Sequence, residues 1–87
     1  MGLDAEQLTQ VARITLAAAS LREAVDGVRR VIPGIRASTV DAFDMRGETP
    51  ALHIGNRDLF LMHTDGHCWS VTSDPLVADG IVLTQNP

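Results

Sequence analysis

The chain has no lysine and no tyrosine, and its 87 residues include only one cysteine, one tryptophan and two phenylalanines. A single cysteine cannot form a disulfide within the chain, which fits a reducing compartment. With so few aromatic residues the core must consist of Leu, Val, Ile and Ala, and such a core is thin at this length. We therefore expect one domain over residues 1–87, with a homodimer or another protein partner covering part of its apolar surface.

Positive charge is scarce as well. The formal net charge of −4 arises from five arginines against four acids in residues 1–36, and two arginines against seven acids in residues 37–87. An acidic chain without a basic run is poorly suited to phosphate backbones, so we expect no nucleic-acid partner. The use of arginine for every basic residue is typical of a GC-rich bacterial gene.

Long apolar runs are missing. No segment reaches the roughly 18 apolar residues that a membrane-spanning helix requires, and the first ten residues lack the basic and apolar regions of a signal peptide. The sequence therefore predicts no membrane partner and a cytoplasmic location.

Catalytic sequence motifs are also missing. The chain contains no Cys-x-x-Cys, no His-Glu-x-x-His, no Gly-x-Ser-x-Gly and no glycine-rich phosphate loop. The acids Asp41, Asp44 and Glu48 are interpreted as solvated rather than catalytic, because Arg46 lies among them in the sequence. We therefore expect a protein that is not an enzyme.

What is present begins with a helical segment over residues 4–32. Asp4 is suited to cap its start, and the pair Ser20 and Glu23 has the spacing of a capping box that begins a second helix. Two helices are favoured, with one kinked helix as the alternative. Pro33 and Gly34 end the segment, because the residue before a proline avoids helical geometry.

The remainder, residues 35–85, predicts a sheet. Strands are expected in the segments 35–43, 51–54, 58–64, 67–73 and 81–85, with one helical turn over 73–80. The order of helices followed by strands predicts an α+β fold, with two N-terminal helices on one face of a mostly antiparallel sheet of three to five strands. Whether 51–54 is a separate strand, and whether the last strand pairs in parallel, stay open.

The dipeptide Asp65-Gly66 predicts a two-residue type I′ turn between two of these strands. That turn would place Met62 opposite Trp69, and directly opposed residues share a face. The resulting apolar face contains four residues, which we expect to pack on the helices with Trp69 as a core anchor: Phe60, Met62, Trp69 and Val71.

The same turn would place His63 opposite Cys68 on the other face. Histidine and cysteine are ligands of soft metals such as zinc, and His53 would be a third ligand if its strand lies alongside with the same face outward. A second tight turn at residues 55–56 would place Asp58 opposite His53 and orient its ring. The metal candidates are therefore His53, His63 and Cys68, and the alternative is a structural His–Cys pair without metal.

The segment "HCWSVTSDPLVADGIVLTQ", residues 67–85, resembles the end of a small uncharacterised bacterial family whose genes often lie among nitrogen-fixation genes. The family pattern is a His-Cys strand, a Ser/Thr-Asp-Pro turn and a Gly-Ile/Val-Val-Leu strand. The residues that carry the resemblance are His67, Cys68, Asp74, Pro75, Gly80, Val82 and Leu83. The resemblance implies an accessory protein near metal-cluster enzymes, without an assigned activity.

Two functions follow as hypotheses. The first is a small non-enzymatic accessory or protein-interaction domain that dimerises or docks through a sheet edge or an apolar helix face. Four arginines of the first half would then recognise an acidic partner or align two protomers. These are Arg22, Arg29, Arg30 and Arg36. The alternative is that they only keep the surface soluble. The second is a metal- or ligand-binding module that uses His53, His63 and Cys68.

Overall fold

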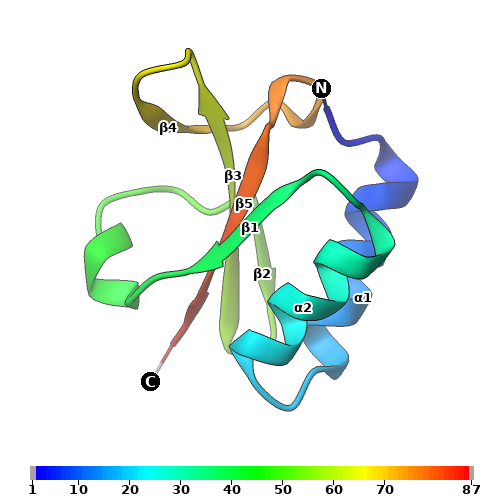
Figure 1. Ribbon diagram of the computed structural model, residues 1–87. Coiled ribbons are helices and arrows are strands. Elements are labelled where there is room, and N and C mark those ends of the chain that lie inside the picture. Colours follow the sequence, from blue (N-terminus) through cyan, green and yellow to red (C-terminus); the bar gives the residue numbers. More distant parts are fainter. Residues whose placement is uncertain (1, 87) are drawn as a thin grey trace.

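The computed structural model describes residues 2–86 and contains two helices followed by a five-stranded sheet (Figure 1). The elements are α1 (Ala5–Ala17), α2 (Leu21–Val31), β1 (Arg36–Thr39), β2 (Leu52–Ile54), β3 (Arg57–Thr64), β4 (Trp69–Thr72) and β5 (Gly80–Gln85). Two short 3₁₀ turns lie between strands, η1 (Ala42–Met45) and η2 (Pro75–Val77). The predicted α+β class with two N-terminal helices is confirmed.

The helix boundaries follow the capping residues. The Asp4 carboxylate accepts a hydrogen bond from the backbone N–H of Gln7 at 2.7 Å, and the Gln7 side chain accepts one in return from the N–H of Asp4. The Ser20 hydroxyl accepts from the N–H of Glu23, while the Glu23 carboxylate accepts from the N–H of Ala19 rather than of Ser20. The chain therefore forms two helices and not one kinked helix.

The sheet is mixed rather than purely antiparallel. Its strand order is β1-β5-β3-β2. The strand β4 pairs with the C-terminal half of β3, on the same edge of β3 as β2. The last strand, β5, pairs in parallel with β1 and antiparallel with β3, which answers the question of its direction. Residues 52–54 form a separate strand, whereas the predicted strand over 35–43 is shorter, because Asp41 caps η1 by accepting the N–H of Phe43.

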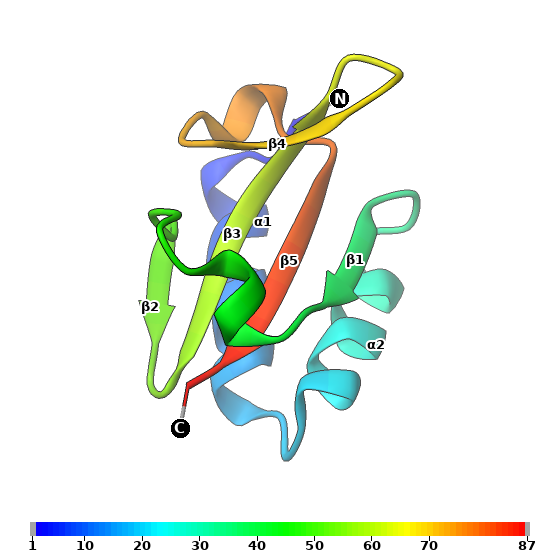
Figure 2. The ribbon, with the colours of Figure 1, turned by 90° about the vertical axis from the view of Figure 1, so that its left-hand side faces the viewer.

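Both helices cover one face of this sheet (Figure 2). The pairs Leu59–Leu83 and Leu61–Ile81 lie on that face, and all four side chains are buried in one cluster with residues of α1 and α2. The neighbouring positions point the opposite way, because side chains alternate along a strand. We call the opposite side, on which Phe60, Met62 and Val82 lie, the open face.

Arg57 ties the sheet to the end of α1. Its Nη1 donates to the carbonyl oxygens of Thr15 and Ala18, both at 2.7 Å, and its Nε donates to Gln85 Oε1 at 2.8 Å. The last turn of α1 has no basic residue of its own. Arg57 therefore supplies from β3 the positive charge that the carboxyl end of a helix favours.

The predicted hairpin register is wrong by two residues. Thr64 pairs with Trp69, so the loop contains four residues, 65–68, instead of two. A type I′ turn needs a positive φ at both central residues, and within residues 2–86 only glycines have one, here Gly66 at +101°. The Asp65 carboxylate instead accepts the N–H groups of His67 and Cys68, at 2.9 and 3.0 Å, and holds the wider loop.

The expectation that Trp69 anchors the core against the helices is also wrong. A shift of two residues keeps Trp69 on the same face as Met62, but the helices cover the other face of the sheet. Trp69 lies on the open face, and 41% of its surface is exposed. The alternation along the strands correctly predicts that Trp69 and Met62 share a face, but the helices cover the other face, which contains Leu59 and Leu61.

Candidate functional site

His53 lies on β2 and points to the open face. The tight turn at residues 55–56 pairs it with Asp58, as expected, and His53 Nδ1 lies 2.5 Å from Asp58 Oδ1. Its side chain is 74% exposed. The ring is therefore oriented by one carboxylate and is otherwise open to solvent.

His63 lies on the opposite face of the sheet from His53. It follows Asp58 by five residues on β3, a rise of about 17 Å in a strand, and an odd separation puts the two side chains on opposite faces. His63 Nδ1 lies 2.9 Å from the carbonyl oxygen of Val77 and 3.1 Å from Asp79 Oδ2. The Thr64 N–H also donates to Asp79 Oδ2, and this bond first, with the nearby His63, lowers the pKa of the Asp79 carboxyl.

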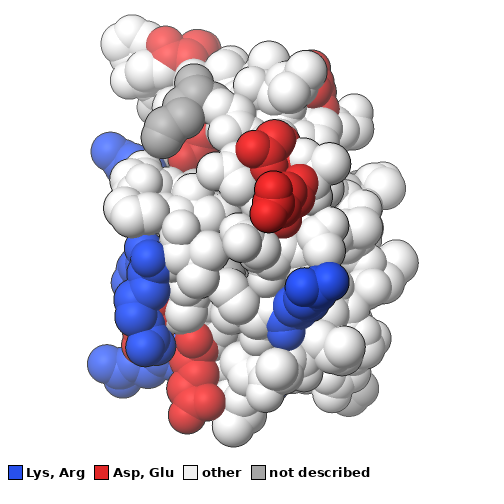
Figure 3. All heavy atoms as spheres, turned by 90° about the vertical axis from the view of Figure 1, so that its right-hand side faces the viewer, with Lys and Arg blue, Asp and Glu red and all other residues white. Residues whose placement is uncertain are grey.

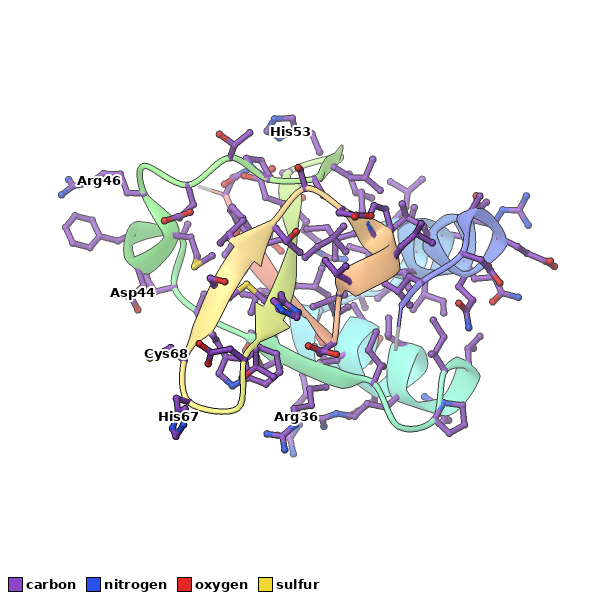
Figure 4. The ribbon with its side chains drawn as sticks, turned by 90° about the horizontal axis from the view of Figure 1, so that it is seen from above. Arg36, Asp44, Arg46, His53, His67 and Cys68 are labelled. Carbon is purple, nitrogen blue, oxygen red and sulfur yellow. The ribbon has the colours of Figure 1, made fainter. Side chains whose placement is uncertain are left out.

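Cys68 lies in the hairpin loop, not opposite His63, which pairs with Ser70. The thiol is exposed, and the Cys68 N–H, followed by that of His67, lowers the pKa of the Asp65 carboxyl by hydrogen bonding to it. Figure 4 shows Cys68 and His67 on the far side of the molecule from His53. The three predicted metal ligands are therefore not brought together, and residues 2–86 contain no group of three His, Cys, Asp or Glu side chains arranged to hold a metal ion.

The open face contains the feature that most resembles a binding site. A hollow of about 540 Å³ lies between β1, β5, β3 and β4, with Met62 and Val82 among its lining residues and Trp69 at the hairpin side. Two arginines, Arg29 and Arg36, complete the polar part of its wall. None of the lining residues, all within the described chain, is acidic, although the protein as a whole is. The volume is within the range of small-molecule ligand pockets.

Trp69 and Arg36 form the rim of this hollow. The Arg36 guanidinium carbon lies 5.6 Å from the centre of the Trp69 ring, which is within cation–π distance. Gly80 lies beneath them on β5, where a Cβ atom would come within 2.7 Å of the Arg36 carbonyl oxygen and 3.4 Å of the Trp69 ring. Glycine at this position therefore allows β1 and the tryptophan to lie close to β5.

The free edge of β1 is less accessible than the open face. The N–H groups of Arg36 and Val40 donate to the carbonyl oxygens of Asp79 and Leu83, toward β5. Because neighbouring residues of a strand point their backbone groups in opposite directions, the Ala37 carbonyl points away from β5, to the free edge. Arg29 of α2 donates to that carbonyl at 2.6 Å. The edge is thus only four residues long and partly occupied, which are two ways in which proteins block strand addition.

The hollow on the helix-covered side is smaller, about 180 Å³, and Leu3, Ile32 and Ala78 are among its lining residues. Figure 3 shows arginine side chains along one margin of this side and another farther across it, with acidic groups beside and between them. One such pair is Arg29 and Asp26, whose charged atoms lie 3.9 Å apart. None of the helices among residues 2–86 has the length and apolar character needed to cross a bilayer.

Comparisons with protein-family models, with curated proteins and with solved structures gave no match for this chain. The resemblance of residues 67–85 to a family found near nitrogen-fixation genes therefore stays a prediction.

The sequence pattern does not predict the hollow. It places Trp69 and Met62 in a buried patch, and it gives Arg36 only as one of the positive charges of the first half. The one available signal was Gly80 at the start of a strand, since glycine in a strand often marks close approach of another group. That signal does not say which residues approach.

Proposed function

We propose that this protein is a small non-enzymatic interaction domain that binds another protein through the open face of its sheet, at the hollow beside Trp69. The observation that carries the proposal is the exposure of Trp69, 41% of whose surface is in contact with solvent above an apolar floor. Interfaces are enriched in Trp, Met and Arg and depleted in acids, and the lining of the hollow has this composition.

The arrangement also suits a binding hot spot. Tryptophan and arginine are the side chains that most often dominate binding energy, particularly at the centre of a contact where neighbours exclude water. Here Arg36 and Trp69 are already in contact, so a partner would meet an ordered pair. Ordering before binding lowers the entropic cost of association.

Site-specific photocrosslinking tests this proposal. We would introduce a photoreactive amino acid at Ser38, which is exposed and lines the hollow, and at Leu16, which is exposed on α1. Irradiation in cells of the source organism should give a covalent adduct from position 38 and not from position 16, and Trp69→Ala should remove it. Equal adducts from both positions, or adducts from position 16 alone, would contradict the proposal.

A further inference from the structure

The charge of the hollow specifies the chemistry of its occupant. Its lining contains Arg29 and Arg36, while the molecule carries a net charge of −4. Arg29 already donates to a backbone carbonyl, but within residues 2–86 the Arg36 guanidinium forms no ion pair or hydrogen bond and lies over the Trp69 ring. An occupant that combines an apolar or aromatic group with a carboxylate would complement both parts of the site.

The chain itself presents such a group. Phe43, in η1, is 66% exposed and stands between Asp41 and Asp44 in the sequence. Arg46 lies over the Phe43 ring at 4.3 Å, and the Asp44 carboxylate has no ion-pair partner among residues 2–86. Figure 4 shows Asp44 and Arg46 projecting from η1, away from the sheet.

The projecting segment is also held in one conformation. The Asp41 carboxylate accepts the N–H of Phe43 at 2.8 Å, and the Asp41 carbonyl accepts the N–H of Asp44 at 2.9 Å. The N–H of Arg46 closes the turn on the Phe43 carbonyl. Little backbone entropy is then lost when Phe43 enters a pocket.

The geometry points to a second copy of this chain as the occupant: Phe43 of one protomer enters the hollow of the other, and Asp44 pairs with Arg36 across the interface. This inference rests on the proposed function and names its partner. Both features lie on the open face, since η1 adjoins Phe60 and Thr84 of that face while the hollow includes Met62 and Val82. One two-fold axis between them satisfies both contacts at once and closes the assembly as a dimer.

Charge reversal at the two pairing residues tests the inference. Native mass spectrometry and sedimentation equilibrium of the wild type should show a species of twice 9.4 kDa that dissociates on dilution. Arg36→Glu and Asp44→Arg should each weaken it at least about tenfold, because each creates two like-charge contacts. An equimolar mixture of the two variants should form a heterodimer, since both contacts are then between opposite charges.

Phe43→Ala should weaken the dimer as well, and Leu16→Ala is its matched control. Leu16 is 67% exposed, close to the 66% of Phe43, but lies on α1 away from the open face. We expect Leu16→Ala to leave the dissociation constant unchanged. Because the mixing experiment restores binding between two variants, it also excludes misfolding as the reason for the loss.

Three results would overturn the inference: a monomer at every concentration, a dimer that tolerates both charge reversals, or single losses without rescue on mixing. The photocrosslinking experiment separates these from failure of the proposed function. An adduct at Ser38 whose mass differs from two copies of the chain would leave the interaction surface standing and remove the second copy as its occupant. An adduct of two copies at Ser38, lost in Phe43→Ala, would support both.

Discussion

The two faces of the sheet differ although the same strands build them. On the covered face Leu59 and Leu61 are 0% and 1% exposed beneath the helices. On the open face Phe60 and Val82 are also buried, but Met62 is only partly covered and Trp69 is 41% exposed. The covered face holds the domain together, whereas the open face retains apolar area that folding of one chain does not bury, and such area marks an interaction site.

The largest expected effect compares neighbours on β3 that point to the two faces. Leu61→Ala should lower the free energy of unfolding by about 3 kcal/mol, because it leaves a cavity in the core beneath the helices. Met62→Ala removes a side chain of similar size from the open face and should cost about 1 kcal/mol. Urea unfolding followed by circular dichroism measures both, and equal losses would break the distinction between the faces.

Arg57→Ala should lower the free energy of unfolding by about 2 kcal/mol, because the carbonyls of Thr15 and Ala18 lose a charged hydrogen-bond donor at the end of α1. The substitution tests whether a side chain from the covered face of β3 is needed to hold the helices on the sheet. Arg57→Lys keeps the charge but not the planar group, and should recover part of the loss in the same urea assay. A loss in Arg57→Ala below about 0.5 kcal/mol would show that the contact is not needed.

Thr15→Val should raise the free energy of unfolding by about 1 kcal/mol, in the opposite direction from the other core changes. Thr15 is 0% exposed, and its hydroxyl is the one fully buried side-chain polar atom without a hydrogen-bond partner in the described residues. Valine has the same shape without the polar group that burial penalises. Thermal unfolding should have a higher midpoint in Thr15→Val than in the wild type. A lower midpoint would indicate that the Thr15 hydroxyl has a hydrogen-bond partner in solution.

Trp69→Ala should change the stability of the monomer by less than about 1 kcal/mol, since it removes a half-exposed ring and one cation–π contact. The same substitution should abolish binding at the open face. Thermal unfolding followed by circular dichroism, at a protein concentration below the dissociation constant of the dimer, measures the effect on monomer stability separately from the effect on binding. A loss comparable to that of Leu61→Ala would mean that Trp69 belongs to the core after all.

The smallest effects concern acid stability. The pKa values of Asp65 and Asp79 are lowered in the fold by backbone N–H donors, so each carboxylate stabilises the fold above its unfolded pKa of about 3.9. That contribution is lost as the pH falls through the lower folded pKa. Below pH 4, the midpoint of urea unfolding should fall less steeply with decreasing pH in Asp65→Asn and in Asp79→Asn than in the wild type. An unchanged decline in both variants would show that these bonds do not form in solution.

The local features of the chain were predictable because short-range rules determine them. Asp4 and Ser20 cap the helices, and the tight turn at residues 55–56 pairs His53 with Asp58, as their sequence spacing indicates. The hairpin loop was not predicted, because Asp-Gly is compatible with two loop lengths. The choice between them depends on hydrogen bonds from the backbone of residues 67 and 68 to Asp65.

The metal candidates failed to converge for a related reason. Sequence spacing placed His53, His63 and Cys68 on neighbouring strands, but a metal site needs one common face. The odd separation along β3 and the wider loop put them at different places. Faces and registers of several strands must all agree for ligands to meet, so an error in one of them is enough to remove a site.

The residue pattern alone indicates the two helices, the approximate positions of the strands, and the apolar residues on both faces of β3. Which face the helices cover, how β5 pairs, and where Arg36 and Trp69 meet depend on the tertiary structure. The physical reason is that alternation along a strand is symmetric with respect to its two faces. The choice between them depends on the burial summed over elements that are distant in the sequence.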